Sequence, residues 1–239
     1  MDVAPHPHMG LQTVSWLASG EIIHRDSLGC EALMRAGQLN LMTAGRGISH
    51  SEETPKENSG KLQGVQLWIA LPADQRHTEP LFDHYASLPV FSIESATVRV
   101  IIGEILRHRS PARGFSPIVG AEILLNESNA IDLPLNRQFE HAAMVMSGDC
   151  ILDGRPVDRD ALHYFAPGRD ELRIGGSKDL RLLLIGGEPF GEEIVMWWNF
   201  VGRTREEMAT ARQDWEQHAR FGEVKNYNGA RVAAPDLIS

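Results

Sequence analysis

Two short pairs of potential metal ligands constrain this 239-residue chain more than any other feature. His6-Pro7-His8 lies near its start, and His50-Ser51-Glu52 lies further along. Side chains two residues apart on a β-strand point to the same face of a sheet, so each pair can aim at one point. If the pairs occupy neighbouring strands, three imidazoles and one carboxylate meet. The alternative is that each is an ordinary surface pair, because so short a motif often occurs without a metal.

The residue types of the four predicted ligands, His6, His8, His50 and Glu52, indicate an open transition-metal site. Neutral imidazole suits Fe, Ni, Cu, Zn and Mn, and one carboxylate adds an oxygen donor. Neither cysteine lies near these pairs, so a thiolate-rich structural zinc site is not expected. Four protein ligands on an octahedral ion leave two adjacent positions for water, a chelating substrate or dioxygen.

The chain between the two pairs has the strand and turn pattern of a small antiparallel barrel. Leu11–Leu17 is rich in Thr, Val and Trp, and turns follow at Ser19-Gly20 and at Asp26–Gly29. This succession of hairpins differs from the strand–helix alternation of a parallel sheet. Even-numbered residues of the first strand are predicted to line the barrel interior, namely His6, His8, Gln12, Val14 and Trp16.

The second half of the chain repeats the pattern of the first. Met144–Ile151 reads like Ser15–Ile22, and Pro167-Gly168 reads like Ala36-Gly37, which predicts an internal duplication. In this alignment the positions of the four ligands are occupied by Pro134, Asn136, Arg181 and Leu183. The second barrel is therefore predicted to lack metal ligands.

The duplication predicts two domains. Residues 1–105 form an N-terminal metal-binding barrel, and residues 106–239 form a C-terminal barrel with a helix near 205–220 and a tail. Thr204–Glu207 has the pattern of a capping box at the start of that helix. Apolar residues then follow at helical spacing, and we expect them to pack against the core.

Longer phrases of the sequence resemble those of the pirin family, within the cupin superfamily. They are His6–Val14, His24–Gly29, Met42–Glu52, Gly64–Trp68, Gly187–Pro189 and Asn199–Val201, which together span nearly the whole chain. The resemblance implies an all-β bicupin, that is, two antiparallel cupin-type β-barrels with a short C-terminal helix. It also implies that His6, His8, His50 and Glu52 are the iron ligands.

The same resemblance implies a function. Pirins are known as iron proteins with quercetin 2,3-dioxygenase activity, so a mononuclear Fe(II) dioxygenase acting with O2 on a flavonol or similar small aromatic is expected. Mn, Ni, Cu, Co or Zn are alternative metals, and Glu52 is expected to help take the substrate's hydroxyl proton. The alternative, from a different class, is an iron-binding regulatory or redox-sensing protein that acts through a protein partner without turnover.

Candidate substrate-pocket residues are Gln12, Trp16, Met42 and Trp68. Large residues at such positions can equally fill a barrel, which is the interpretation that we favour for Trp68. Gln12 departs from the family pattern, since many cupins have a glutamate there, and glutamine is neither a strong anionic ligand nor a base. Glu52 must then carry the negative charge of the site.

The start of the chain also departs from the family pattern. Met1–Val3 reads like the interior of a pirin sequence, so we expect the first barrel to lack upstream strands. An unpaired strand edge would follow and would promote dimerisation, so a monomer or a weak dimer is expected.

Composition excludes several other classes of protein. The net charge is −9 and no compensating block of Lys and Arg is visible, which argues against direct nucleic-acid binding. Two cysteines cannot make a disulfide framework, and no signal peptide or apolar run of membrane-spanning length is present. A cytoplasmic protein without a membrane span is therefore predicted.

Overall fold

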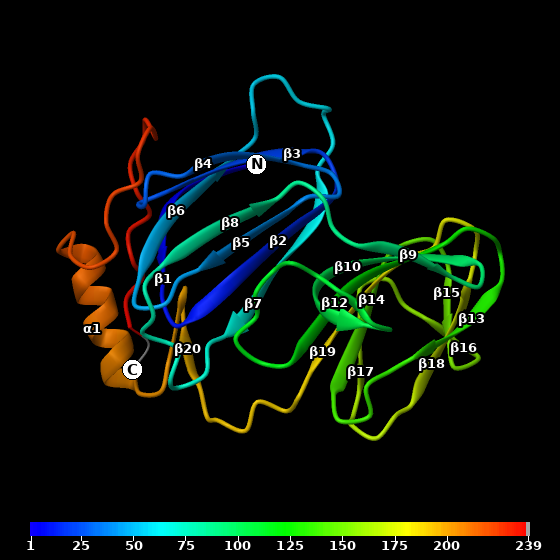
Figure 1. Cartoon of the computed structure of the whole chain (residues 1–239). Coiled ribbons are helices and arrows are strands. Elements are labelled where there is room, and N and C mark those ends of the chain that lie inside the picture. Colours follow the sequence, from blue (N-terminus) through cyan, green and yellow to red (C-terminus); the bar gives the residue numbers. More distant parts are fainter. Residues whose placement is uncertain (238–239) are drawn as a thin grey trace. The chain divides into compact units, whose positions relative to one another are not determined.

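Antiparallel β-strands make up almost all the regular structure of residues 1–237, the part of the chain that this computed structural model describes (Figure 1). The strands divide into two units. The first comprises Met1–Ser87 and the segment from Glu192 onwards, and the second comprises Leu88–Gly191.

The first unit contains two four-stranded sheets and a separate hairpin. Its strands are β1 (Asp2–His8), β2 (Leu11–Ser19), β3 (Glu21–Asp26), β4 (Glu31–Arg35), β5 (Leu39–Thr43), β6 (Ile48–Glu53), β7 (Gln63–Ala70), β8 (Leu81–Tyr85), β20 (Val195–Trp197) and β21 (Phe200–Gly202). One sheet has the order β1-β6-β3-β4 and the other has the order β7-β2-β5-β8, while β20 pairs with β21.

The second unit contains the remaining strands. They are β9 (Val90–Ile93), β10 (Ala96–Ile105), β11 (His108–Arg109), β12 (Ile118–Leu125), β13 (Ala130–Pro134), β14 (Glu140–Ser147), β15 (Cys150–Leu152), β16 (Arg155–Val157), β17 (Leu162–Phe165), β18 (Glu171–Gly176) and β19 (Arg181–Gly187). One sheet has the order β11-β10-β12-β19-β14-β17, with β9 also paired to β10, and the other has the order β13-β18-β15-β16.

The strand orders of the two units repeat. The order β1-β6-β3-β4 recurs as β13-β18-β15-β16, and β7-β2-β5 recurs as β19-β14-β17. Gly20 and Gly148, the glycines aligned from the sequence, both have positive φ, 91° and 87°, in the turns after β2 and β14. The all-β bicupin fold and the internal duplication are thus confirmed.

One detail of the predicted alignment is wrong. Pro167-Gly168 joins β17 to β18 and so matches Ala44-Gly45, which joins β5 to β6, and not Ala36-Gly37. Arg181 and Leu183 therefore lie on β19, whereas the counterpart of β6 is β18. The error arose because two similar turns flank β5, and the sequence comparison matched the earlier one.

The C-terminal part of the chain returns to the first unit. Met9, at the end of β1, packs with Phe200 of β21 and with Trp215 and Phe221 in one apolar cluster. The observed division therefore differs from the expected break at residue 105. Burial of these large aromatic side chains against the N-terminal segment explains the return, because such burial removes much apolar surface from water.

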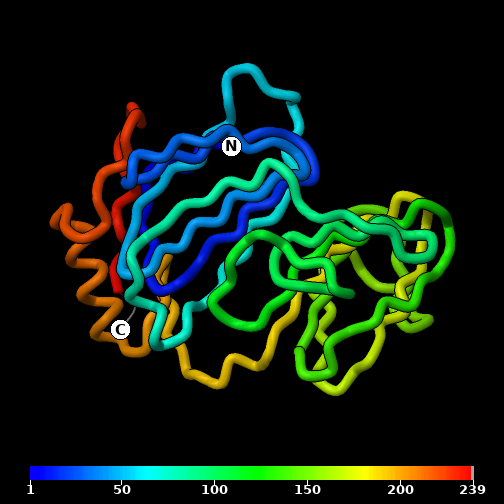
Figure 2. Tube along the Cα trace, in the orientation of Figure 1, coloured from blue at the N-terminus to red at the C-terminus, as the bar shows by residue number. Residues whose placement is uncertain are grey.

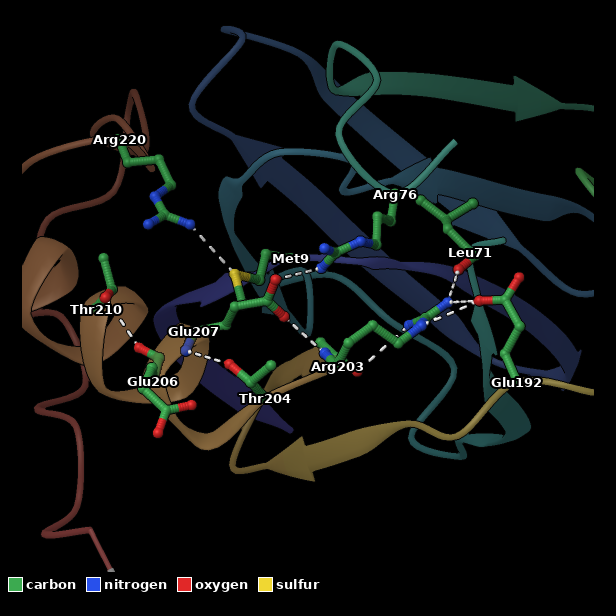
Figure 3. A network of polar contacts seen from close by, with 11 residues as sticks. Met9, Leu71, Arg76, Glu192, Arg203, Thr204, Glu206, Glu207, Thr210 and Arg220 are labelled. Carbon is green, nitrogen blue, oxygen red and sulfur yellow. Dashed lines mark hydrogen bonds and ion pairs between the residues drawn. The ribbon is translucent and has the colours of Figure 1, made fainter. Parts of the chain in front are cut away.

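The predicted helix is α1 (Arg205–Glu216), and it ends before the expected residue 220. Thr204 caps it, since its hydroxyl accepts the N–H of Glu207 at 3.2 Å. The Glu207 carboxylate accepts the N–H of Arg203 and pairs with Arg76, at 2.7 Å, in the loop after β7 (Figure 3). These contacts tie the helix start to the first unit. No helix within residues 1–237 is long and apolar enough to cross a membrane.

The C-terminal tail runs beside β1, with the tail red and β1 blue in Figure 2. The N–H of Val232 donates to the Pro5 carbonyl at 2.8 Å. The Val232 carbonyl in turn accepts the indole N–H of Trp215 at 2.8 Å. The tail thereby supplies a partner to the edge of β1 that faces away from β6.

Candidate metal centre

Three buried histidines meet inside the first unit. His6 and His8 lie on β1 and His50 lies on β6, directly opposite His6 in the antiparallel register. Their ring nitrogens lie within 4.8 Å of one another, and no other group of at least three His, Cys, Asp or Glu in residues 1–237 meets in this way. The i, i+2 spacing on β1 brings the first two together, and strand pairing adds the third.

The geometry of these histidines fits a metal ion. The Nε2 atoms of His8 and His50 lie 3.0 Å apart. Two nitrogen ligands at about 2.1 Å from one ion, at roughly a right angle, lie about 3 Å apart. Two facing lone pairs at this distance repel unless a cation or a proton lies between them. The Nδ1–H of His6 donates to the Ala4 carbonyl at 2.9 Å, which leaves its Nε2 as the nitrogen that could bind a metal.

Burial also favours the protonation state that binds metal. Burial lowers the pKa of His6, and it lowers the pKa of His8 and of His50 well below the usual value. The neighbouring imidazoles add to the lowering at His8 and His50. Neutral imidazole is the form that coordinates metal, so the three rings are ready to act as ligands near neutral pH.

Glu52 lies on the same strand as His50 but is not part of the group of three. Its Oε1 accepts hydrogen bonds from Gln66 Nε2 at 2.8 Å and from Ser15 Oγ at 3.4 Å. Burial raises the pKa of Glu52, while the hydrogen bond from Gln66 lowers it. The carboxyl group is thus placed beside the histidines and oriented by two neutral side chains.

A cavity of about 600 Å³ opens next to this cluster. His6 and Glu52 line it together with Gln66, Trp68 and Asn199. Of the four predicted pocket residues, only Trp68 lines it, and its ring meets the edge of His8 at a centroid distance of 5.2 Å. Our preference for a packing role for Trp68 is therefore not supported, because 38% of its surface is exposed.

Gln12 and Trp16 lie on the opposite face of β2 from Ser15, which points to Glu52. The prediction that the even-numbered residues of β2 line the barrel interior was wrong. The reason is that β1 ends at His8 and a bend at Gly10, with φ 71°, precedes β2. The alternation does not continue across that bend. Met42 does not line the cavity either, because it packs in an apolar cluster with Leu11, Ala44, Ile48 and Val201.

His24 and Asp26 were missed by sequence reasoning as parts of the site. Both are buried on β3, which pairs with β6, and His24 Nδ1 lies 3.4 Å from His50 Nδ1. The His24 ring stacks on Phe82 at a centroid distance of 4.0 Å. The sequence did contain a pattern that could have identified them, because His24 and Asp26 are two residues apart, as are the members of each predicted ligand pair.

Comparison with known proteins gives matches along most of the chain. Residues 1–69 match the family described as Pirin, and residues 120–222 match the Pirin C-terminal cupin domain. A pirin-like protein of Caulobacter vibrioides is 36% identical over 90% of this chain and 75% of its own length.

Solved structures agree with these matches. A crystal structure described as quercetin 2,3-dioxygenase from Acinetobacter baumannii is 42% identical, with a TM-score of 0.97 over 100% of this chain and 80% of that chain. The bacterial pirin YhhW from Escherichia coli, solved in complex with nickel(II), has a TM-score of 0.61 at 18% identity, over 79% of this chain and 77% of that one. This second likeness shows the shared fold alone.

Proposed function

Because this chain belongs to the pirin family, we propose that it is a mononuclear metal-dependent dioxygenase that uses O2 to cleave the ring of a flavonol or a similar small aromatic. The proposal is supported by the meeting of three buried imidazoles next to a cavity that His6 and the carboxyl group of Glu52 line. Its volume, about 600 Å³, lies within the range of small-molecule sites.

The residues that would hold the metal are His6, His8 and His50, with Glu52 as the fourth ligand. We propose Fe(II) as the native ion, with Mn, Ni, Cu, Co and Zn as substitutes that this donor set also suits. When bound, the metal supplies a Lewis-acid centre with open positions for a chelating substrate and for dioxygen.

The protein side chains perform the remaining tasks. Glu52 takes the substrate's hydroxyl proton, a role supported by its raised pKa, since burial makes its carboxylate a better base. Gln66 and Ser15 hold Glu52 Oε1 in place during this step. Trp68 offers a planar apolar wall against which an aromatic substrate can stack.

The test is metal analysis of protein purified without added metal, followed by oxygen uptake with quercetin. We expect about one metal ion per chain and oxygen consumption that matches the loss of quercetin. Iron-loaded protein that consumes no oxygen with any flavonol would exclude this proposal and favour the regulatory alternative, in which the oxidation state of iron changes affinity for a protein partner.

The role of Glu52 is tested by Glu52→Gln. General-base catalysis typically contributes a factor of about 10² to 10⁴, so the rate should fall within that range while the imidazole ligands retain metal. Glu122→Gln is the matched control, since Glu122 is also buried but pairs with Arg99 and Arg181 in the second unit. Equal rates for Glu52→Gln and the wild type would refute the role.

A further inference from the structure

A chain of buried polar groups leads away from His50 on the side opposite the ligand cluster. His50 Nε2 faces His8, and its other ring nitrogen, Nδ1, faces Nδ1 of His24 at 3.4 Å. His24 Nε2 contacts Asp26 Oδ2 at 3.1 Å. Asp26 and His24 are both buried, so bulk water does not compete for these contacts.

The orientation of each hydrogen bond follows from the end of the chain. Asp26 Oδ1 accepts the backbone N–H groups of Leu28 at 2.9 Å and Cys30 at 3.0 Å, which fixes the carboxylate. A carboxylate can only accept, so the proton between Asp26 and His24 resides on His24 Nε2. In its neutral form His24 then has a lone pair on Nδ1 and accepts the Nδ1–H of His50.

We propose that Asp26 and His24 are positioning residues that fix His50 in the tautomer whose Nε2 lone pair faces the metal. The inference rests on the assignment of His50 as a ligand in the proposed function. Stacking of His24 on Phe82, at an interplanar angle of 8°, sets the plane of the imidazole that receives the His50 proton. Partners of this kind orient ligating histidines and raise their basicity.

Strand pairing explains why these residues meet. In the register of β3 and β6, Asp26 lies opposite His50 and His24 lies opposite Glu52. All four side chains therefore share one face of the sheet, since directly opposed residues and residues two apart point the same way. The polar chain is a direct consequence of that register.

The first test replaces the carboxylate. In Asp26→Asn the amide can donate to His24 Nε2, which reverses the direction of both hydrogen bonds and places the His50 proton on Nε2. We expect Fe(II) affinity to fall about 10- to 100-fold under anaerobic titration against a competing chelator. Asp132→Asn is the matched control, because Asp132 pairs with Arg173, at 2.7 Å, in the second unit. It should leave Fe(II) affinity unchanged.

The second test removes and then restores the acceptor. His24→Phe keeps an aromatic ring against Phe82 but has no nitrogen for His50, so Fe(II) affinity should fall. His24→Asn returns an oxygen near the former Nδ1 and should recover part of the loss. His108→Phe is the control, since His108 stacks on Phe91 at the same centroid distance, 4.0 Å, in the second unit.

The direct readout is the tautomer of His50 in metal-free protein, from long-range proton–nitrogen correlation spectra of ¹⁵N-histidine-labelled samples. We expect Nδ1–H in the wild type and Nε2–H in Asp26→Asn. An unchanged tautomer in Asp26→Asn, or equal Fe(II) affinity for the wild type and His24→Phe, would overturn the inference. Thermal unfolding of the metal-free variants is measured alongside, and if His24→Phe fails to fold, Asp26→Asn and His24→Asn decide.

Neither readout uses flavonol turnover, so the two proposals fail separately. Wild-type protein that binds Fe(II) and shows the Nδ1–H tautomer, yet consumes no oxygen with flavonols, would refute the dioxygenase and leave the positioning role intact. An unchanged Fe(II) affinity and an unchanged His50 tautomer in Asp26→Asn would refute the positioning role alone.

Discussion

The two barrels share a strand order but differ in the side chains that point inward from matching strands. In the first unit His6 on β1 lies opposite His50 on β6. In the second unit the matching strands are β13 and β18, where Ile131 lies opposite Ile174, and both are fully buried. The same backbone arrangement thus supports a polar cluster in one unit and an apolar core in the other. The fold supplies the scaffold, and the inward-facing residues decide whether a site exists.

This difference has an energetic consequence. Burying a polar group without a full set of hydrogen bonds costs about 1–3 kcal/mol, whereas burying an isoleucine side chain contributes about 1.5–3 kcal/mol. The first barrel therefore gives up packing energy at the positions that would hold a metal. Metal binding would offset this cost, because binding to the folded form alone adds to stability.

The largest expected effect separates the units by metal content. His50→Ala removes one of the proposed ligands, so bound metal should fall from about one ion per chain to none. His141→Ala is the control, since His141 is also buried but lies in the second unit. Elemental analysis of both variants checks this. Substantial metal remaining in His50→Ala would mean that another site binds it and that the contrast between the barrels is wrong.

The second prediction concerns the apolar pair. Ile174→Ala leaves a cavity in the core of the second unit and should lower the free energy of unfolding by about 2–5 kcal/mol. Metal content should stay unchanged. Ile151→Ala is the matched control, because Ile151 lies on β15 of the same unit and is exposed. Its effect should stay within about 0.5 kcal/mol in urea unfolding. Equal losses in the two variants would contradict the assignment of Ile174 to the core.

The sequence predicted that His6, His8 and His50 would meet, because strand alternation is a local rule. The spacing of His6 and His8 alone places both on one face. The same rule failed for Gln12 and Trp16, since the bend at Gly10 separates β1 from β2 and restarts the alternation. A single residue of positive φ was enough to reverse the predicted face of a strand.

Contacts that depend on register between distant strands could not be predicted from the sequence. Ser15 and Gln66 are opposite one another on β2 and β7, and only this pairing directs both side chains to Glu52. The expected break at residue 105 failed to anticipate the return of β20, β21 and α1 to the first unit for a similar reason. That return depends on an aromatic cluster whose members lie far apart in the chain.

A smaller effect is expected from pH in the second unit. Burial, and then the charge of Arg169, lower the pKa of His141 in the folded protein. The unfolded chain, with a pKa near 6.5, then binds the proton first as pH falls, so His141 contributes stability that is present above pH 6.5 and is lost below it. The slope from this group cannot exceed about 1.4 kcal/mol per pH unit.

Urea unfolding of the wild type and His141→Gln at pH 7.5 and pH 5.5 measures this contribution. The wild type should lose more stability than the variant on acidification, because glutamine does not titrate. An equal loss in both proteins would show that His141 is not held neutral by its surroundings.

The smallest predicted effect tests which unit the helix stabilises. Thr204→Ala removes the hydroxyl that accepts the Glu207 N–H and should cost about 1 kcal/mol. Thr210→Ala, on the same helix but away from the cap, should be neutral or slightly stabilising, since alanine is the better helix former. Because α1 packs with Met9 and Phe200, the loss should appear as faster amide hydrogen exchange in β1 and β21, with β13 and β18 unchanged. Faster exchange confined to β13 and β18 would instead assign the helix to the second unit, as the division at residue 105 had it.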